Sequence, residues 1–284
     1  MKISLYTQIL PRLETFFLEE WIEYHKNLGI DKFYIYDSVS VDSNESNPDK
    51  WGKKPHLDYF EDYTDAQIYE ELYKILDKYR GLVDLVKWQP KCECILNSRQ
   101  KCQAYGYKHC ILNNESDWWL HIDPDEFLYS KNKLNFKDFL KINEEKNNYS
   151  ISFNQRVFEA RQRNKRVADI NIYGYDVNIR KTIVKNPYIG EKEKSWQPKI
   201  DEKWFDEEHW VRNMFIHDLE SKHGLGQNRD FLRTLKKNKI NPDKVTDFND
   251  FRINHYRGYP YEENSMHTRF VESMQIKKFN KTDF

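Results

Sequence analysis

Three carboxylates close the apolar run WWLHIDPDEF at residues 118–127: Asp123, Asp125 and Glu126. Carboxylates this close together repel one another and raise each other's pKa unless a positive charge lies nearby. A divalent cation removes that repulsion, and an oxygen-rich site with one imidazole suits Mn²⁺ or Mg²⁺. The D-x-D pattern therefore indicates a metal site, although a solvated acidic turn produces the same pattern.

A metal at this position has a specific chemical use. A divalent cation neutralises the charge that develops on a phosphate as the bond to it breaks. Nucleotide sugars carry a diphosphate leaving group of this kind. Such chemistry requires a scaffold that brings several strand ends together, and the rest of the chain is informative on that point.

Strands and helices alternate in the first half of the chain. The pattern predicts strands at residues 3–10, 32–37, 82–88 and 117–122, and helices at 14–29, 65–81 and 93–114. We expect the first two helices to close at Gly29 and Gly81. This alternation predicts an α/β fold with a Rossmann-like, mostly parallel central sheet flanked by helices. Asp37 and the 123–126 cluster both follow strands, at the sheet edge where such folds bind ligands.

The second half is less regular. It predicts strands at residues 149–158, 177–185 and 213–217, and a C-terminal helix at 261–279. The polar, aromatic segment Trp196–Trp210 is long enough to be a functional loop that covers a donor or shapes an acceptor site, or else a surface excursion. We expect one domain over residues 1–284, with a nucleotide-sugar half at 1–130 and an acceptor half at 131–284.

Composition narrows the function classes. The chain has 46 basic and 46 acidic residues, so it offers no basic field for a nucleic acid. It shows no apolar run of membrane-spanning length and no signal peptide, which predicts a cytoplasmic protein or one at the cytosolic face of a membrane. The four cysteines lack the CxxC spacing of a zinc site, and Cys102 and Cys110 are expected to pack as small apolar groups.

Several segments, taken in their order along the chain, resemble a known family. They are EEWIEYHKNLGIDKFYIYDSVSVD, QAYGYKHC, DWWLHIDPDEFL, KTIVKNPYI, MFIH and RINHYRGYPYEE. Together they resemble glycosyltransferase family 92 and its family 2-like relatives, which have the GT-A fold. The sequence departs from that pattern in three places. TQILPRLE lacks the usual Lys-Asn-Glu, YDSVSVD replaces an Asn-rich turn, and no Lys-Ser follows the late His-Tyr.

The resemblance implies a metal-dependent, inverting transfer of a hexose, of the glucose or galactose type. The donor would be a UDP-sugar, and the acceptor a hydroxyl of a glycan, glycoprotein or glycolipid. Asp37 would accept the uracil N3–H, or else cap the turn after its strand. Gln103 matches the family's nucleotide-side helix. Asp123 would contact the ribose hydroxyls, or the metal through water, and Asp125 would ligate the metal directly. His255 would be the third protein ligand, and its imidazole favours Mn²⁺ over Mg²⁺.

The remaining candidates are less fixed. Inversion needs a carboxylate base near the acceptor oxygen; Asp218 is the first choice, and Glu159, Glu207 and Glu220 stay open. Glu126 supports a ligand or only the turn, and His217 lines the acceptor side. Three basic residues would meet phosphate, or would guard a sheet edge against pairing: Arg180, Lys181 and Lys185.

Two other functions fit parts of the pattern. A strand ending in D-x-D also opens metal-dependent phosphohydrolases of the haloacid dehalogenase type, but there the motif lies near the N-terminus. A non-catalytic module that binds nucleotide sugars or glycans would keep the same fold. Asp123, Asp125 and His255 argue for turnover, since a module that has lost activity has no need of them.

Overall fold

The computed structural model of this protein describes residues 1–37, 63–88, 106–107, 109–111, 113–146, 148, 150–158, 173–185, 244–247, 249–256 and 277–278. Several expectations fall outside these residues. Among them are the strand at 213–217, the loop Trp196–Trp210 and most of the helix at 93–114.

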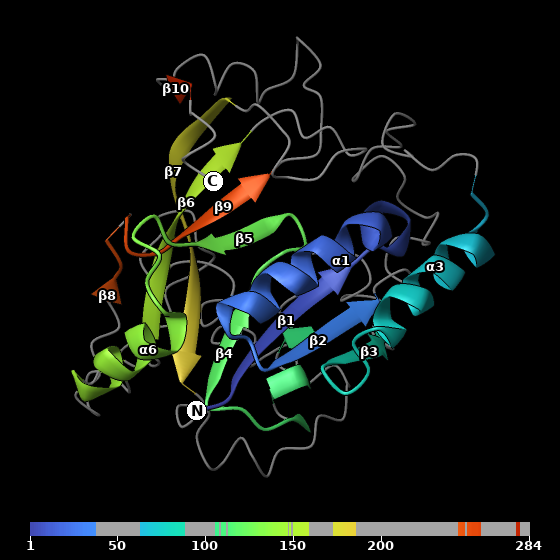
Figure 1. The fold of residues 1–284 in the computed structure, drawn as a ribbon, viewed down its shortest axis with the longest axis horizontal. Helices are drawn as coiled ribbons and strands as arrows, with labels where there is room; N and C mark the ends of the chain where they lie inside the picture. Colours follow the sequence, from blue (N-terminus) through green and yellow to red (C-terminus); the bar gives the residue numbers. More distant parts are fainter. Residues whose placement is uncertain are drawn as a thin grey trace, which may run out of the picture.

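The described chain forms one ten-stranded sheet, in the order β3-β2-β1-β4-β7-β6-β9-β5, with β10 paired to β7 and β8 to β6 (Figure 1). The strands are β1 (Ile3–Ile9), β2 (Lys32–Asp37), β3 (Val83–Lys87), β4 (Trp118–His121), β5 (Glu126–Tyr129), β6 (Ser150–Phe158), β7 (Tyr173–Lys185), β8 (Lys244–Val245), β9 (Arg252–Tyr256) and β10 (Lys277–Lys278). The helices whose whole length lies in the described residues are α1 (Pro11–Leu28), α3 (Asp65–Asp77) and α6 (Phe136–Glu145).

The two halves of the sheet differ in direction. β1 pairs in parallel with β2 and β4, and β2 pairs in parallel with β3. Beyond β4 the pairing becomes mixed, because β7 is antiparallel to both β4 and β6, and β5 is antiparallel to β9. The α/β class and the parallel central part are therefore confirmed. The four parallel strands end on the same edge, as ligand sites in such sheets require.

Alternation along β1 separates two cores. Leu5 belongs to the hydrophobic core under α1, which contains Trp21 and Phe33. Tyr6 points to the other face, where its ring lies 5.2 Å from that of Tyr107 in a helical stretch. Helices therefore cover both faces of the sheet, as the sequence predicted; α1 and α3 lie side by side on one of them (Figure 1).

Two glycines were expected to end helices, and only one does so. Gly29 follows α1 with φ 106° and closes it as a left-handed cap. α3, which starts in a capping box at Thr64, ends at Asp77, four residues before the predicted Gly81. The chain after Asp77 forms tight turns, in which the Leu82 N–H donates to the Tyr79 carbonyl at 2.9 Å. Gly81, at φ 84°, serves that turn instead.

Helix α6 was not predicted from the sequence. Asn135 caps it, and Phe136 and Leu140 are buried while Ile142 is exposed, so only a narrow stripe of this short helix is apolar. The predicted helix at 261–279 is also corrected at one point, because the described residues Lys277–Lys278 form strand β10 against β7.

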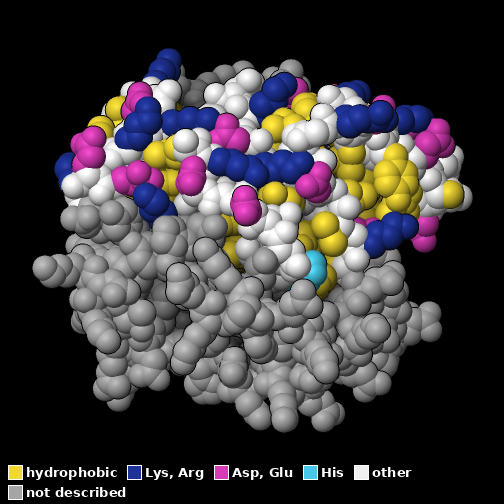
Figure 2. All heavy atoms as spheres, turned by 90° about the horizontal axis from the view of Figure 1, so that it is seen from below, with side chains coloured by type: hydrophobic (Ala, Val, Ile, Leu, Met, Phe, Trp, Pro, Cys, Tyr) yellow, Lys and Arg dark blue, Asp and Glu magenta, His cyan; other side chains and the backbone are white. Residues whose placement is uncertain are grey.

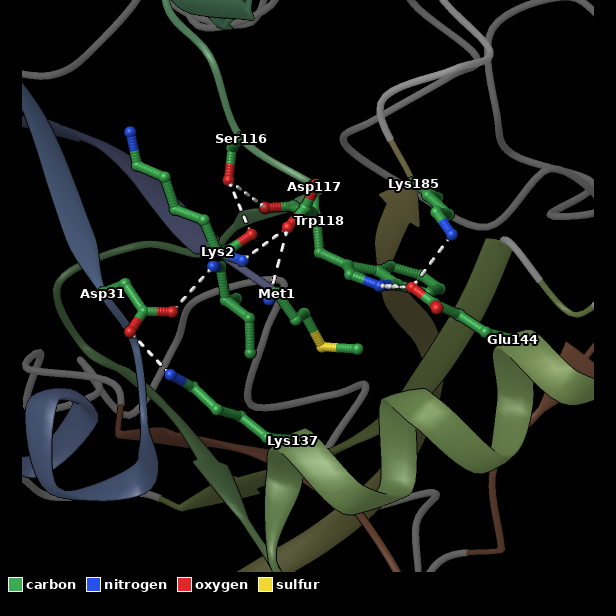
Figure 3. A network of polar contacts seen from close by, with 10 residues as sticks. Met1, Lys2, Asp31, Ser116, Asp117, Trp118, Lys137, Glu144 and Lys185 are labelled. Atoms are coloured by element: carbon green, nitrogen blue, oxygen red, sulfur yellow. Dashed lines mark hydrogen bonds and ion pairs between the residues drawn. The ribbon is translucent and has the colours of Figure 1, made fainter.

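A polar network joins α6 to the amino ends of β1 and β4 (Figure 3). Asp31 accepts from the Ile3 N–H at 2.9 Å and from Lys137 Nζ at 2.6 Å. Glu144 accepts from Trp118 Nε1 at 2.7 Å and lies 3.0 Å from Lys185 Nζ. Lys185 is therefore placed at the end of β4 opposite to the carboxylate cluster, and the phosphate contact considered for it is not supported.

Charges of both signs are interspersed on the face seen in Figure 2, so neither sign dominates its described part. Lys78, the residue that follows α3, lies 2.8 Å from Glu19 of α1. Such exposed pairs contribute little to stability. None of the described helices is long and apolar enough to cross a membrane.

Candidate active site

The carboxylate cluster occupies a tight turn between β4 and β5. Asp123 precedes Pro124, a favoured arrangement for the first two residues of a β-turn. The Glu126 N–H donates to the Asp123 carbonyl at 2.9 Å, and the Asp123 N–H donates to Glu126 Oε2 at 2.8 Å. The order D-P-D-E thus folds into a turn closed by its own first and last residues. Of the two roles left open for Glu126, support of the turn is confirmed.

His255 reaches this turn through strand pairing. β5 and β9 are antiparallel with Glu126 opposite His255, and the Tyr256 N–H donates to the Asp125 carbonyl at 2.8 Å. As a result His255 Nε2 lies 3.4 Å from Asp125 Oδ2. Both side chains remain partly exposed, at 18% and 30%. The two residues expected to ligate a metal are therefore brought together, while ligation itself stays a prediction.

A buried lysine completes the cluster. Lys181 Nζ, on β7, lies 3.1 Å from Asp123 Oδ2 and 3.1 Å from Glu126 Oε2, and its side chain is 3% exposed. Burial by itself lowers the pKa of Lys181, but Asp123 and Glu126 outweigh it and hold the pKa above its ordinary value. Burial raises the pKa of Glu126, while Lys181 opposes that rise. At neutral pH Lys181 is therefore an ammonium ion among the carboxylates.

Two polar residues near the cluster were missed in the sequence. Gln155 Nε2, on β6, donates to Glu126 Oε1 at 2.9 Å. His121, the buried last residue of β4, has Nε2 3.8 Å from Asp123 Oδ1 and its ring 5.1 Å from Tyr6. The only sequence signal for His121 was its position two residues before Asp123.

Helix α1 holds β5 in place from the outside. β5 is the last strand of the sheet, and three α1 side chains at helical spacing bond to its backbone. Trp21 Nε1 donates to the Glu126 carbonyl at 2.9 Å, and Tyr24 Oη donates to the Leu128 carbonyl at 2.9 Å. His25 Nε2 accepts from the Leu128 N–H at 3.3 Å. The strand edge is thereby covered, and the turn that carries the acids is anchored.

His25 acts here as a neutral group. Its side chain is fully buried, and burial lowers the pKa of His25 to about 3, although the Trp21 carbonyl opposes this shift. With Nε2 accepting from Leu128, Nδ1 carries the hydrogen and donates to the Trp21 carbonyl at 2.8 Å. His25 is therefore a structural residue beneath the site.

Asp37 lies at the same sheet edge but is already engaged. It ends β2, is 5% exposed, and accepts from Tyr69 Oη of α3 at 2.7 Å. β1 separates β2 from β4, and the three run in parallel, so Asp37 and the acidic turn share the expected edge. The tyrosine contact favours the structural reading of Asp37; a contact to the base stays a prediction.

Comparison with known proteins decides the family. The sequence pattern of glycosyltransferase family 92 matches residues 63–283, well over half of the chain. The chain belongs to glycosyltransferase family 92. The match confirms the resemblance drawn from the motifs, although the N-terminal segment at 19–42 lies outside it.

Curated family 92 relatives match over shorter stretches. A family 92 protein of Oryza sativa subsp. japonica is 27% identical over 137 residues, covering 48% of this chain and 17% of the rice protein. One from Ricinus communis is 27% identical over 127 residues, covering 44% of this chain and 17% of its own length. The matched part is thus about a sixth of each relative.

Solved structures show weaker similarity. Staphylococcus aureus TarS 1–349 in complex with UDP-GlcNAc gives a TM-score of 0.41 at 12% identity, covering 92% of this chain and 60% of that one. The galactosyltransferase LgtC with donor and acceptor sugar analogs gives 0.40 at 12% identity, covering 95% and 94%. Scores of this size support no comparison of the sites.

The side chains that could ligate a metal in this family 92 chain suit a cation that a bound diphosphate also ligates. Among the described side chains, no three His, Cys, Asp and Glu groups form a ready metal cage. Asp125 Oδ2 and His255 Nε2, however, are 3.4 Å apart. Adjacent ligands of one octahedral ion, each bonded at about 2.1 Å, are separated by about 3 Å, and Mg²⁺ commonly takes only one or two protein ligands beside phosphates and water. The pair therefore fits a divalent cation held jointly with a diphosphate.

Several predicted site residues lie outside the described part of the chain. They are Gln103, Glu159, Glu207, His217, Asp218 and Glu220, together with the side chain of Arg180. The acceptor side and the candidate base accordingly remain sequence predictions.

Proposed function

We propose that this family 92 chain is a metal-dependent glycosyltransferase that moves a hexose from a UDP-sugar to an acceptor hydroxyl with inversion. The observation that carries this proposal is the approach of Asp125 Oδ2 and His255 Nε2 to 3.4 Å beside the carboxyl ends of the parallel strands. Family membership supports the transferase class.

Each protein group then has a role in binding or orientation. Asp125 and His255 hold the cation, which when bound supplies positive charge beside the leaving diphosphate. Asp123 meets the ribose side of the nucleotide, Asp37 accepts from the uracil N3–H, and Gln103 contributes to nucleotide binding. A carboxylate of the acceptor half, with Asp218 as first choice, takes the proton from the acceptor hydroxyl.

The partners follow from that chemistry. The donor is a UDP-sugar of the glucose or galactose type, and the acceptor is a glycan, glycoprotein or glycolipid. The site is expected to work in the cytoplasm or at the cytosolic face of a membrane.

Release of UDP tests this proposal on the full chain. UDP-glucose, UDP-galactose and UDP-N-acetylglucosamine are each incubated with protein in Mn²⁺ or in EDTA. We expect one donor to release UDP at least about tenfold faster with Mn²⁺, because the metal stabilises the leaving group. Equal rates in Mn²⁺ and EDTA for every donor would contradict metal dependence. Binding of UDP without release from any donor would instead indicate a non-catalytic module.

A further inference from the structure

Lys181 is unusual in its placement. Its neighbour two residues on, Ile183, pairs with Leu120 of β4, so Lys181 lies just past the end of β4, level with the acidic turn. Its ammonium group is 3.1 Å from one carboxylate oxygen each of Asp123 and Glu126, and its side chain is 3% exposed. A lysine at an open sheet edge, which the sequence allowed, would keep its head group in water.

This contact separates the two aspartates of the D-x-D motif. Asp123 faces Lys181 with Oδ2 and, at 3.8 Å, the His121 imidazole with Oδ1, so both oxygens are directed at protein groups. Asp125 Oδ2 faces His255 Nε2 instead. The carboxylates are two residues apart in sequence but belong to different partner sets.

Glu126 lies between Lys181 and His255, the histidine proposed to ligate the metal. Its two oxygens are held by Lys181 and by Gln155, the latter at 2.9 Å. In that position Oε1 lies 3.8 Å from His255 Nδ1. At this distance the contact is one of charge and not a hydrogen bond; Glu126 lies on the Nδ1 side of the ring, while Nε2 faces Asp125.

We propose that Lys181 is an internal counter-ion that withholds Asp123 from direct metal coordination, leaving Asp125 and His255 as the protein's direct ligands. Lys181 is a positioning residue in this scheme, since it acts through Asp123 and Glu126. The inference rests on the cation of the proposed function, and it gives Lys181 as the reason why Asp123 stays an indirect partner of that cation. Metal affinity rises with the number of charged ligands, so Lys181 keeps the protein's own hold on the ion moderate.

The test measures Mn²⁺ affinity of the full chain, from the electron paramagnetic resonance signal of free Mn²⁺, without any sugar donor. Lys181→Met releases the Asp123 carboxylate, so Mn²⁺ should bind about tenfold more tightly. Adding Asp123→Asn to that variant should cancel the gain. Unchanged or weaker binding by Lys181→Met would overturn the proposal.

A matched control comes from the same strand. Lys185→Met also removes an ion-paired lysine, but its partner is Glu144 at the other end of β4. It should leave Mn²⁺ affinity unchanged within about twofold. A tenfold gain in this control as well would show a general charge effect and overturn the role assigned to Lys181.

The thermal stability of Lys181→Met gives a second readout, and a second variant covers the case in which Lys181→Met does not fold. Loss of a buried ion-pair partner should lower the Tm of metal-free Lys181→Met by about 10 °C. Mn²⁺ should raise the Tm of Lys181→Met by more than it raises the Tm of wild type. If Lys181→Met does not fold, Asp123→Asn in the wild-type background decides. A Mn²⁺ affinity of Asp123→Asn within about twofold of wild type supports the proposal, and a tenfold lower affinity refutes it.

Failure of the proposed function gives a different result. Normal Mn²⁺ binding with the expected Lys181 pattern but no UDP release from any donor would remove only the transferase proposal. Wild type that binds no Mn²⁺, with Lys181→Met gaining a site, would support the counter-ion and remove metal dependence. Absence of binding in both proteins would overturn the inference.

Discussion

Asp125→Asn is expected to lower Mn²⁺-dependent UDP release by at least about 100-fold, at equal donor concentration. A metal at a leaving group contributes several kcal/mol, and each 1.36 kcal/mol corresponds to about tenfold in rate. The fold should be retained, because the Asp125 side chain is 30% exposed and the bond from Tyr256 uses its backbone carbonyl. The rate is measured as UDP released per unit time.

Asp138→Asn is the matched control for this variant. Asp138 is another aspartate near a turn, but it lies in the first turn of α6 with its side chain 66% exposed. Its UDP release should equal that of wild type. Asp125→Asn that retains more than about a tenth of wild-type activity would contradict the role given to the Asp125 carboxylate in holding the metal.

Trp21→Ala is expected to cost about 3–5 kcal/mol in the free energy of unfolding. The side chain is fully buried, with its rings 5.7 Å from Phe33 and 4.8 Å from His25. Its Nε1 also bonds to the Glu126 carbonyl at the start of β5. Truncation leaves a large cavity under the sheet and an unpaired buried carbonyl, and urea unfolding followed by circular dichroism measures the loss.

Trp21→Phe separates the two contributions. It keeps most of the packing and removes the N–H donor, so we expect a smaller loss of about 1–2 kcal/mol. Equal losses in the two variants would show that the hydrogen bond, and not the buried ring, dominates. A loss under about 1 kcal/mol for Trp21→Ala would contradict the role of α1 as the anchor of β5.

The parallel half of the fold was readable from the sequence. Its strands are apolar runs that alternate with amphipathic helices, and Gly29 marks the end of α1 by its left-handed backbone. The placement of Asp37 and the acidic turn on one edge followed from parallel strand direction alone. Local signals therefore sufficed wherever the chain continued a regular strand–helix alternation.

The mixed half was not readable in the same way. The pairing of Glu126 with His255, and the place of Lys181 beside Asp123, depend on the register between distant strands. Register is set by packing and turn geometry that no local pattern contains. The family resemblance supplied His255, whereas Lys181 was predicted only as a phosphate contact or as a guard of the sheet edge.

Gly81 and α6 show two smaller limits. A glycine after a helical pattern predicts its end, yet here tight turns intervened and Gly81 serves a turn. α6 is only 10 residues long, and the apolar spacing in so short a stretch does not by itself distinguish a helix from a strand. In both cases tertiary contacts decided what the local sequence left open.

The most direct test of the central claim asks whether His255 binds the cation. The protein is labelled with ¹⁵N-histidine, loaded with Mn²⁺ and UDP, and measured by pulsed electron paramagnetic resonance. Because the chain has 9 histidines, His255→Gln is measured alongside wild type. We predict a coupling of Mn²⁺ to one directly bound ¹⁵N in wild type that disappears in His255→Gln. A wild-type spectrum without ¹⁵N coupling, or a coupling that survives in His255→Gln, would contradict a metal site built from Asp125 and His255.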